Sequence, residues 1–114
     1  MTRIVVAESN PDGGLLLEQA LTALGHEVRL ARDAFAAVSH AIALPAEVLV
    51  LSTSLPKGRS SEVVRLIRAA GVQPRRIIGL AQHGDSGRDL PEACAWLLWP
   101  LAPDDLQVVC DDQH

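Results

Sequence analysis

The chain has 114 residues, of which 48% are apolar, and its formal net charge is -4. A chain of this length can bury one core, so we expect a single domain over residues 1–114. The composition excludes a disordered or fibrous protein. No apolar run approaches the roughly 20 residues of a membrane-spanning helix, which predicts a cytoplasmic location and no membrane contact.

Short apolar segments alternate along the chain with segments of helical period. The first strand is expected at residues 3–7, after which Asn10 and Pro11 provide a cap and a first turn for a helix. A second strand is expected at 27–30 and a second helix at 33–44. The apolar spacing predicts which side chains these helices bury, namely Leu17, Ala20, Leu21 and Leu24 in the first helix and Phe35, Val38 and Ile42 in the second.

The alternation continues through the middle of the chain. A third strand is expected at 48–51, and a helix then begins near Ser60 and ends at Gly71. A fourth strand is expected at 76–80. The apolar spacing of the third helix predicts a buried face made of Val63, Leu66, Ile67 and Ala70.

The segment between the last two expected strands is the least regular. Residues 82–95 include two glycines and Pro91, which predicts a fourth helix that is short or irregular. A fifth strand at 96–99 and a last helix from about Pro103 complete the pattern. Because apolar strands alternate with amphipathic helices, the chain is predicted to be an α/β protein whose five-stranded parallel sheet is doubly wound, with helices on both faces.

The cysteines and histidines show no metal-ligand spacing. Cys94 and Cys110 lie outside any Cys-x-x-Cys motif, so we expect neither a zinc site nor a disulfide framework. The histidines are equally scattered, at His26, His40, His83 and His114. The chain also lacks a glycine-rich phosphate loop, and we therefore predict no bound metal and no cofactor.

Six of the ten basic residues lie within twenty consecutive positions, where Glu62 is the only acid. These six residues are Lys57, Arg59, Arg65, Arg68, Arg75 and Arg76. Their clustering predicts a locally positive surface. The net charge of -4 nevertheless disfavours nucleic acid as its partner, because nucleic-acid binding depends on neutralising phosphates with Lys and Arg.

Five positions at the ends of the expected strands connect the sequence to a known family. Glu8 and Ser9 follow the first strand, Ser52 follows the third, Ala81 lies at the fourth and Trp99 at the fifth. In this layout the chain resembles a response-regulator receiver domain, also called CheY-like, over nearly its whole length. The resemblance implies the flavodoxin-like strand order 2-1-3-4-5.

The resemblance also implies that the chemistry of the family has been lost. Receiver domains carry an acidic pair, a phospho-accepting aspartate, a hydroxyl residue and a lysine, and four of these five groups are replaced by Ser9, Ser52, Ala81 and Trp99. Only the acid at Glu8 remains. Mg²⁺ needs carboxylate oxygens and phosphorylation needs a nucleophilic carboxylate beside the metal, so we expect a degenerate phosphorylation pocket and no enzymatic activity.

The leading hypothesis is therefore a pseudo-receiver, which is a phosphorylation-independent protein-protein interaction or dimerisation module in signal transduction or transcriptional regulation, as in two-component systems. Its partner would be another protein, an effector domain or a second copy of the chain. The basic residues form one interaction surface to consider. The segment 91–109 forms the other, because the resemblance implies a dimerisation face there, with Trp96, Leu97, Leu101 and Leu106.

The alternative hypothesis is that the remodelled pocket senses a small ligand. Open α/β sheets bind ligands at the carboxyl ends of their strands. Glu8, Ser9, Ser52, Thr53 and Ala81 would then line the binding site. A phosphoacceptor or enzyme role for Ser52 is the least favoured reading, because the sequence places no base next to this serine.

Overall fold

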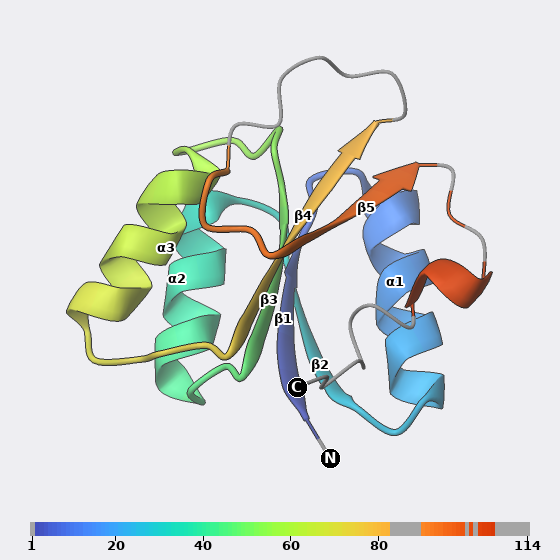
Figure 1. Cartoon of the computed structure of the whole chain (residues 1–114), viewed down its shortest axis with the longest axis horizontal. Helices are drawn as coiled ribbons and strands as arrows, with labels where there is room; N and C mark the ends of the chain where they lie inside the picture. Colours follow the sequence, from blue (N-terminus) through green and yellow to red (C-terminus); the bar gives the residue numbers. More distant parts are fainter. Residues whose placement is uncertain (1, 83–89, 100, 102, 107–114) are drawn as a thin grey trace.

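The computed structural model describes residues 2–82, 90–99, 101 and 103–106 (Figure 1). Its elements, in chain order, are β1 (Arg3–Ala7), α1 (Pro11–Ala23), β2 (Glu27–Ala31), α2 (Ala34–Ala43), β3 (Val48–Ser52), α3 (Ser60–Ala69), β4 (Arg76–Gln82), β5 (Ala95–Trp99) and the short 3-10 helix η1 (Pro103–Leu106). All five predicted strands are present, and none of their ends differs from the prediction by more than two residues.

The strands form one parallel sheet in the order β2-β1-β3-β4-β5, which confirms the predicted fold class. β1 lies between β2 and β3, so that Val5 is opposite Arg29 on one side and Leu49 on the other. Figure 1 shows the sheet between α1 on one face and α2 and α3 on the other. None of the described helices is long and apolar enough to cross a membrane.

Side chains cap the first two helices at their amino ends. The side-chain oxygen of Asn10 accepts hydrogen bonds from the backbone N–H groups of Asp12 and Gly13 at 3.0 and 3.3 Å, which confirms the predicted cap. Asp33 accepts a hydrogen bond from the N–H of Ala36 at 2.7 Å. Both helices therefore begin where short polar side chains satisfy the first backbone donors.

The sheet separates two apolar cores, because successive strand residues point to opposite faces. The core beneath α1 is centred on Ile4, Val6, Leu17, Leu21, Val50, Ile78, Leu80 and Leu97. The core beneath α2 and α3 is centred on Val5, Ala37, Ala41, Leu49, Leu51, Val63, Val64, Ile67 and Ile77.

The buried face of α2 differs from the prediction. Ala34, Ala37 and Ala41 are buried against the sheet, whereas Phe35 is 72% exposed and Ile42 is also exposed. The prediction that Phe35 and Ile42 are buried is therefore wrong. The predicted buried stripe and the observed alanine stripe are offset by one residue, which is about 100° around the helix axis. Both stripes consist of apolar residues at helical spacing, so the sequence pattern fits either one. The alanines face the sheet because small side chains let the helix axis approach it closely.

The other helices need smaller corrections. Leu17 and Leu21 of α1 are buried as predicted, but Leu24 lies beyond the last turn and is exposed. In α3, Leu66 is exposed although it was predicted to be buried. Ala70 follows the helix and is likewise exposed, while Val63, Val64 and Ile67 form the buried face.

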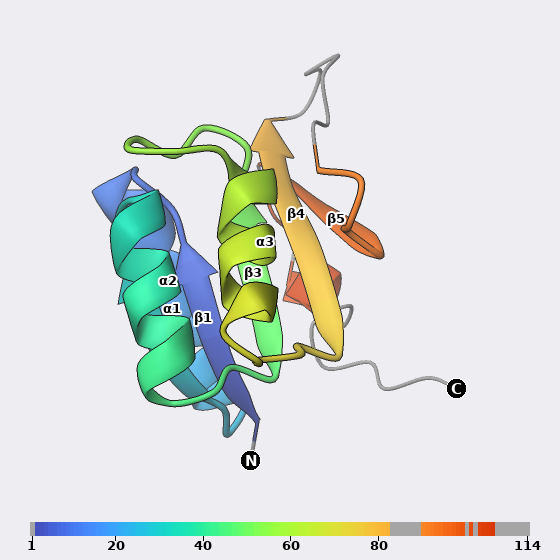
Figure 2. The same ribbon diagram turned by 90° about the vertical axis from the view of Figure 1, so that its left-hand side faces the viewer.

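The connection between β4 and β5 carries no helix in its described part. Residues 90–94 form a turn and a bend, in agreement with the predicted irregular segment, and 83–89 lie outside the described residues. In Figure 2, α2 and α3 lie side by side in front of the sheet and to one side of β5. The predicted last helix is represented by η1, a single 3-10 turn within the described residues.

Trp96 covers part of this face. A Cβ atom placed on Gly79 of β4 would lie only 2.4 Å from Cζ3 of Trp96. Gly79 and Trp96 are paired in the register of β4 and β5, so the indole lies flat over the neighbouring strand. The glycine makes this close approach possible because it has no side chain.

Candidate functional site

The positions expected to form the degenerate phosphorylation pocket lie at one edge of the sheet. Glu8 follows β1, Ser52 ends β3, Ala81 is the penultimate residue of β4 and Trp99 ends β5. All strands are parallel, so their carboxyl ends share this edge. The topology therefore brings these side chains to the same end of the sheet.

Ser52 is held in the turn that follows β3. It is 5% exposed, and its hydroxyl accepts a hydrogen bond from the backbone N–H of Ser54 at 3.1 Å. Its carbonyl accepts a hydrogen bond from the buried hydroxyl of Ser60, the first residue of α3. The next residue, Thr53, donates its N–H to the carbonyl of Leu80 at 3.1 Å. Ser52 thus shapes the loop between β3 and α3.

The retained acid Glu8 is also engaged with the backbone. Its side chain is buried, and one carboxylate oxygen accepts a hydrogen bond from the N–H of Asn10 at 3.0 Å. The neighbouring hydroxyl of Ser9 donates to the carbonyl of Ser54 at 3.4 Å. A contact between neutral groups therefore joins the loops after β1 and β3. Among the residues that the structure describes, no three His, Cys, Asp or Glu side chains gather closely enough to hold a metal ion.

Trp99 packs against the first turn of α1. A Cβ atom on Gly13 would lie 3.0 Å from Cζ2 of Trp99, so the indole rests directly on the helix backbone. Trp99 is half-buried and packs on the α1-side core, while Ala81 is buried at the end of β4. An apolar ring and a methyl group thus stand where the resemblance implies a lysine and a hydroxyl.

The four apolar residues expected to form an interaction surface near β5 are divided between the two faces of the sheet. Trp96 packs against the core beneath α2 and α3. Leu97 is 2% exposed and belongs to the core beneath α1. Leu101 and Leu106 are half-buried against that same core. Within the described residues these side chains therefore serve packing more than exposure, and 107–109 lie outside the described part.

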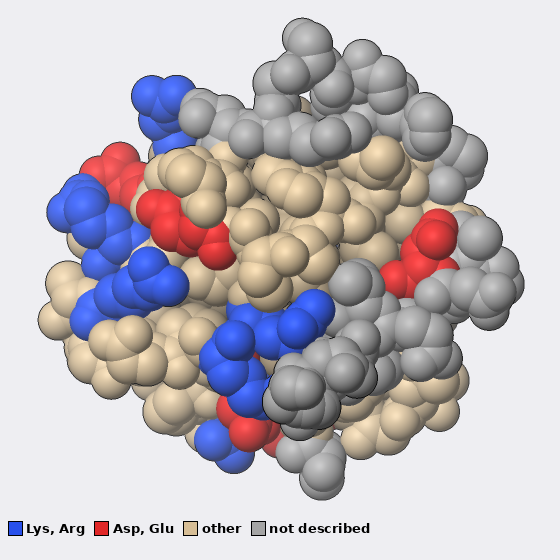
Figure 3. Space-filling view, viewed as in Figure 1, with Lys and Arg blue, Asp and Glu red and all other residues tan. Residues whose placement is uncertain are grey.

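The basic cluster is divided into two groups. Lys57 and Arg59 precede α3, and Arg65 and Arg68 lie within it. The remaining pair, Arg75 and Arg76, lies past the other end of α3, where β4 begins. Figure 3 shows Lys and Arg side chains along the side of the molecule formed by α3 and a second group lower in the view.

The interactions of the second group differ from those of the first. Arg75 donates its N–H to the carbonyl of Glu47 at 2.8 Å, and its guanidinium approaches the hydroxyl of Thr2 at 3.4 Å. These contacts join the start of β4 to the loop before β3 and to the amino end of the chain. Arg75 therefore has a structural role at that end of the sheet.

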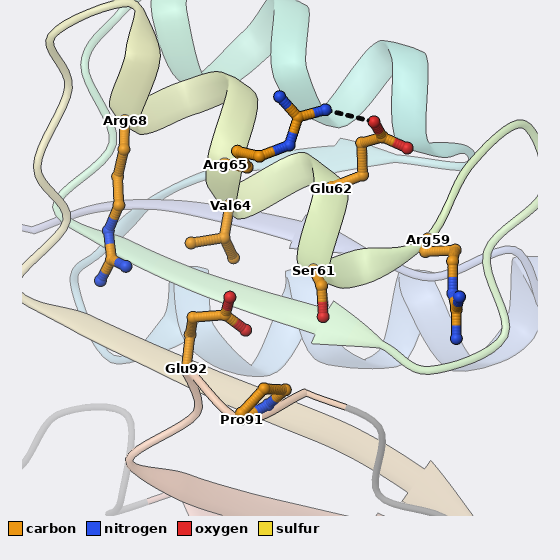
Figure 4. A pocket seen from close by; sticks show the side chains of 8 residues that line it. All are labelled: Arg59, Ser61, Glu62, Val64, Arg65, Arg68, Pro91 and Glu92. Carbon is orange, nitrogen blue, oxygen red and sulfur yellow. Dashed lines mark hydrogen bonds and ion pairs between the residues drawn. The ribbon is translucent and has the colours of Figure 1, made fainter.

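The three arginines of the first group border a groove of about 550 Å³ between α3 and the turn at 90–94. Figure 4 shows Arg59 and Arg68 at opposite ends of one wall and Pro91 and Glu92 on the other wall. Arg65 extends from α3 and forms an ion pair with Glu62 of the same helix. The sequence predicted the cluster of arginines but not the opposite wall of the groove. Pro91 and Glu92 are more than twenty residues from α3 in the sequence, and only the fold of the segment after β4 brings them to the groove.

No protein-family model and no curated protein matches the sequence. Solved structures do match its fold. The chain is similar to the chemotaxis protein CheY4 of Vibrio cholerae, with a TM-score of 0.83 and 21% identity over 96% of each chain. A response regulator receiver domain protein from Clostridium thermocellum gives a TM-score of 0.79 at 19% identity, covering 96% of this chain and 90% of that chain.

A third similar structure is NtrX from Brucella abortus, solved in complex with ATP. It gives a TM-score of 0.84 at 20% identity and covers 96% of this chain but only 26% of the NtrX chain. The structural neighbours are thus CheY-like receiver domains, and this chain has their fold. In NtrX the same fold forms one part of a longer protein.

Proposed function

We propose that this chain is a pseudo-receiver, a phosphorylation-independent interaction module in signal transduction or transcriptional regulation, without enzymatic activity. The proposal depends mainly on one observation. A buried serine, Ser52, occupies the position at which the resemblance implies the phospho-accepting aspartate. Its hydroxyl is already used as the acceptor for the N–H of Ser54. This serine stabilises a loop and presents no carboxylate to a phosphoryl donor.

The electrostatics of the edge support the proposal. Two of the three carboxylates that the resemblance implies are replaced by Ser9 and Ser52, which leaves Glu8 alone. One contact between unit charges at 4 Å is worth about 4 kcal/mol at an effective dielectric constant near 20, so the loss of two such contacts removes most of the attraction for Mg²⁺. A phosphoryl group would also meet the indole of Trp99 in place of a cation, and an anion without a paired charge is poorly tolerated beside an apolar ring.

With the pocket dismantled, the function lies on the surface of the domain. The partner is a protein, an effector domain in the same polypeptide or a second copy of the chain. The similarity to NtrX supports an effector domain as one arrangement, because the matched fold is only 26% of that chain. The groove beside α3 supports a protein partner, since it combines arginines with apolar side chains.

The experiment is a titration of tryptophan fluorescence with Mg²⁺ and then with beryllofluoride, which mimics a phosphoryl group. Trp99 ends β5 at the edge concerned, so binding there would change its emission. We expect no saturable change for the natural chain. Intact mass after incubation with acetyl phosphate should likewise show no added phosphoryl group, and a saturable response or a phosphorylated species would contradict the proposal.

A restored variant serves as the positive control. It combines the substitutions Ser9→Asp, Ser52→Asp, Ala81→Thr and Trp99→Lys, which return every group that the resemblance implies. Because Trp99→Lys removes the tryptophan at this edge, the readout for the restored variant is its intact mass after incubation with Mg²⁺ and acetyl phosphate. The restored variant should gain a phosphoryl group, and the contrast with the unmodified mass of the natural chain assigns the difference to these four positions.

Small-ligand sensing in the same pocket gains no specific support from the described residues. Glu8 and Ser52 are buried and hydrogen-bonded to neighbouring backbone groups. Trp99 packs directly on Gly13. The interaction module is therefore the function that this geometry favours.

A further inference from the structure

An apolar groove lies between α2 and α3, the two helices that face the viewer in Figure 2. Its volume is about 270 Å³. Phe35 and Val38 of α2 line one side, and Val63 and Leu66 of α3 line the other. The groove is distinct from the one beside Pro91, and Glu62 lies between the two and contributes to both.

The outward face of α2 is the first reason to regard this groove as a binding surface. α2 buries Ala34, Ala37 and Ala41 against the sheet, yet Phe35 on its outer side is 72% exposed. Leu66, across the groove on α3, is 42% exposed. A helix that is apolar on both faces is usually covered on both, and neighbouring exposed apolar side chains commonly mark an interaction site.

The charges around the groove indicate the chemistry of the partner. Lys57 forms an ion pair with Asp33 at 3.5 Å, and Arg65 forms one with Glu62. Arg59 and Arg68 lie on the same loop and helix and line the neighbouring groove, whose other wall carries Glu92, so that four cations stand against three carboxylates around α3. This local excess of positive charge stands on a chain with a net charge of -4 and favours an acidic partner.

The same charges argue against a second copy of the chain as the occupant. A symmetric dimer through this face would bring together two patches of the same net positive charge, because the same patch meets itself. Like charges in opposition disfavour that contact. An acidic partner meets no such repulsion.

The size and shape of the groove indicate what enters it. Pockets for drug-sized ligands usually measure about 300–1,000 Å³, and this groove is smaller, at about 270 Å³. It fits a large apolar side chain better than a metabolite. A groove between two parallel walls of helix is also typical of surfaces that bind an amphipathic helix through apolar anchors.

We propose that the α2–α3 face, defined here as Phe35, Val38, Lys57, Arg65 and Leu66, docks an acidic amphipathic helix of a partner protein. One large apolar side chain of that helix enters between Phe35 and Leu66, and its carboxylates meet Lys57 and Arg65. The inference rests on the proposed function as an interaction module and names the surface and the chemistry of its partner.

The test is a selection from a phage-displayed library of helical peptides with randomised outer positions. Peptides selected on the natural chain should carry a bulky apolar residue flanked by Asp or Glu. Synthetic, dye-labelled copies should bind in a fluorescence anisotropy titration, and binding should weaken as the salt concentration rises. Phe35→Ser and Arg65→Glu should each weaken binding at least about tenfold.

Two matched variants control for the kind of substitution. Leu16→Ser removes an apolar side chain that is 54% exposed on α1, at the opposite face of the sheet. Arg75→Glu reverses a charge in the other basic group. Both should leave peptide affinity unchanged, and thermal unfolding should show that Phe35→Ser folds like the natural chain because Phe35 is largely exposed.

Several outcomes would overturn the inference. These are a selection that enriches no peptide, selected peptides without acidic residues, or binding that is equal for the natural chain and Phe35→Ser. A dimer in sedimentation velocity that Phe35→Ser dissociates would assign the face to a second copy instead. The beryllofluoride titration separates this inference from the proposed function. If the titration gives no fluorescence response and the selection enriches no peptide, the docking face is rejected while the proposed function stands.

Discussion

Substitution of Gly79 by alanine tests the close contact between β4 and β5. In the structure the indole of Trp96 lies over Gly79, and an added Cβ would be 2.4, 2.5 and 2.7 Å from three of its ring carbons. Ordinary contacts between carbon atoms measure about 3.5–4.0 Å. The ring would have to move by about 1 Å, although its strand holds its backbone in place.

The expected cost follows from two opposing effects. Forcing a methyl group into a packed contact costs about 1–3 kcal/mol. Replacing glycine by alanine returns about 0.4–1 kcal/mol, because it restricts the unfolded chain. We therefore expect Gly79→Ala to lower the free energy of unfolding by about 1–2 kcal/mol, which corresponds to a fall in Tm of roughly 5–10 °C for a domain of this size.

Urea denaturation followed by circular dichroism measures the change in the free energy of unfolding, and tryptophan emission reports the movement of the ring toward solvent. The double mutant Gly79→Ala with Trp96→Val supplies the control, because the added methyl group then has no ring to displace. In the Trp96→Val background the substitution should be neutral or slightly stabilising. If Gly79→Ala is equally destabilising in both backgrounds, the contact with Trp96 does not explain the glycine.

Three further substitutions test local features. Asn10→Ala should lower the free energy of unfolding by about 1 kcal/mol in urea denaturation because it removes the cap of α1, whereas Asn10→Asp should be nearly neutral, and equal losses would refute the role of the cap. Ser52→Ala should cost about 1 kcal/mol by the same assay, since the N–H of Ser54 loses its acceptor in this part-buried hydrogen bond, while the exposed control Ser54→Ala should change little. The hydrogen bond from the N–H of Ala36 holds the pKa of Asp33 below its usual value of 3.8. The carboxylate of Asp33 therefore binds a proton more readily in the unfolded chain than in the folded protein. Its contribution to the free energy of unfolding is fully present above pH 3.8 and is lost as the pH falls below 3.8 toward the lower pKa of the folded protein. Asp33→Asn should flatten the acid side of the curve of stability against pH, and an unchanged slope would contradict this explanation.

The sequence predicted the order of elements because local signals are strong in this chain. Apolar runs of strand length, the cap at Asn10 and the glycine at position 71 each act within a few residues. Since the strands are parallel and their carboxyl ends share one edge, the same reasoning also brought Glu8, Ser52 and Trp99 to a common site. The hydrogen bond from Ser9 to Ser54 was not predictable, because it joins two loops that only the folded sheet brings together.

The basic cluster illustrates where proximity in sequence misleads. Lys57 and Arg76 are only nineteen positions apart, but α3 lies between them and its ten residues span about 15 Å. The helix therefore carries the chain to the opposite end of the sheet, and one expected patch becomes two. The wall of the groove that faces α3 comes from Pro91 and Glu92, which are far from it in sequence.

By itself, the sequence determined the class of fold and which residues stand at the carboxyl ends of the strands, because these depend on strand order and residue chemistry. Only the tertiary structure decided which stripe of α2 faces the sheet. The helical period accommodates both stripes, and the choice depends on how closely Ala37 and Ala41 let the helix pack on β1 and β2. That choice leaves Phe35 at the surface, where the sequence had predicted a core residue and the structure presents a docking face to test.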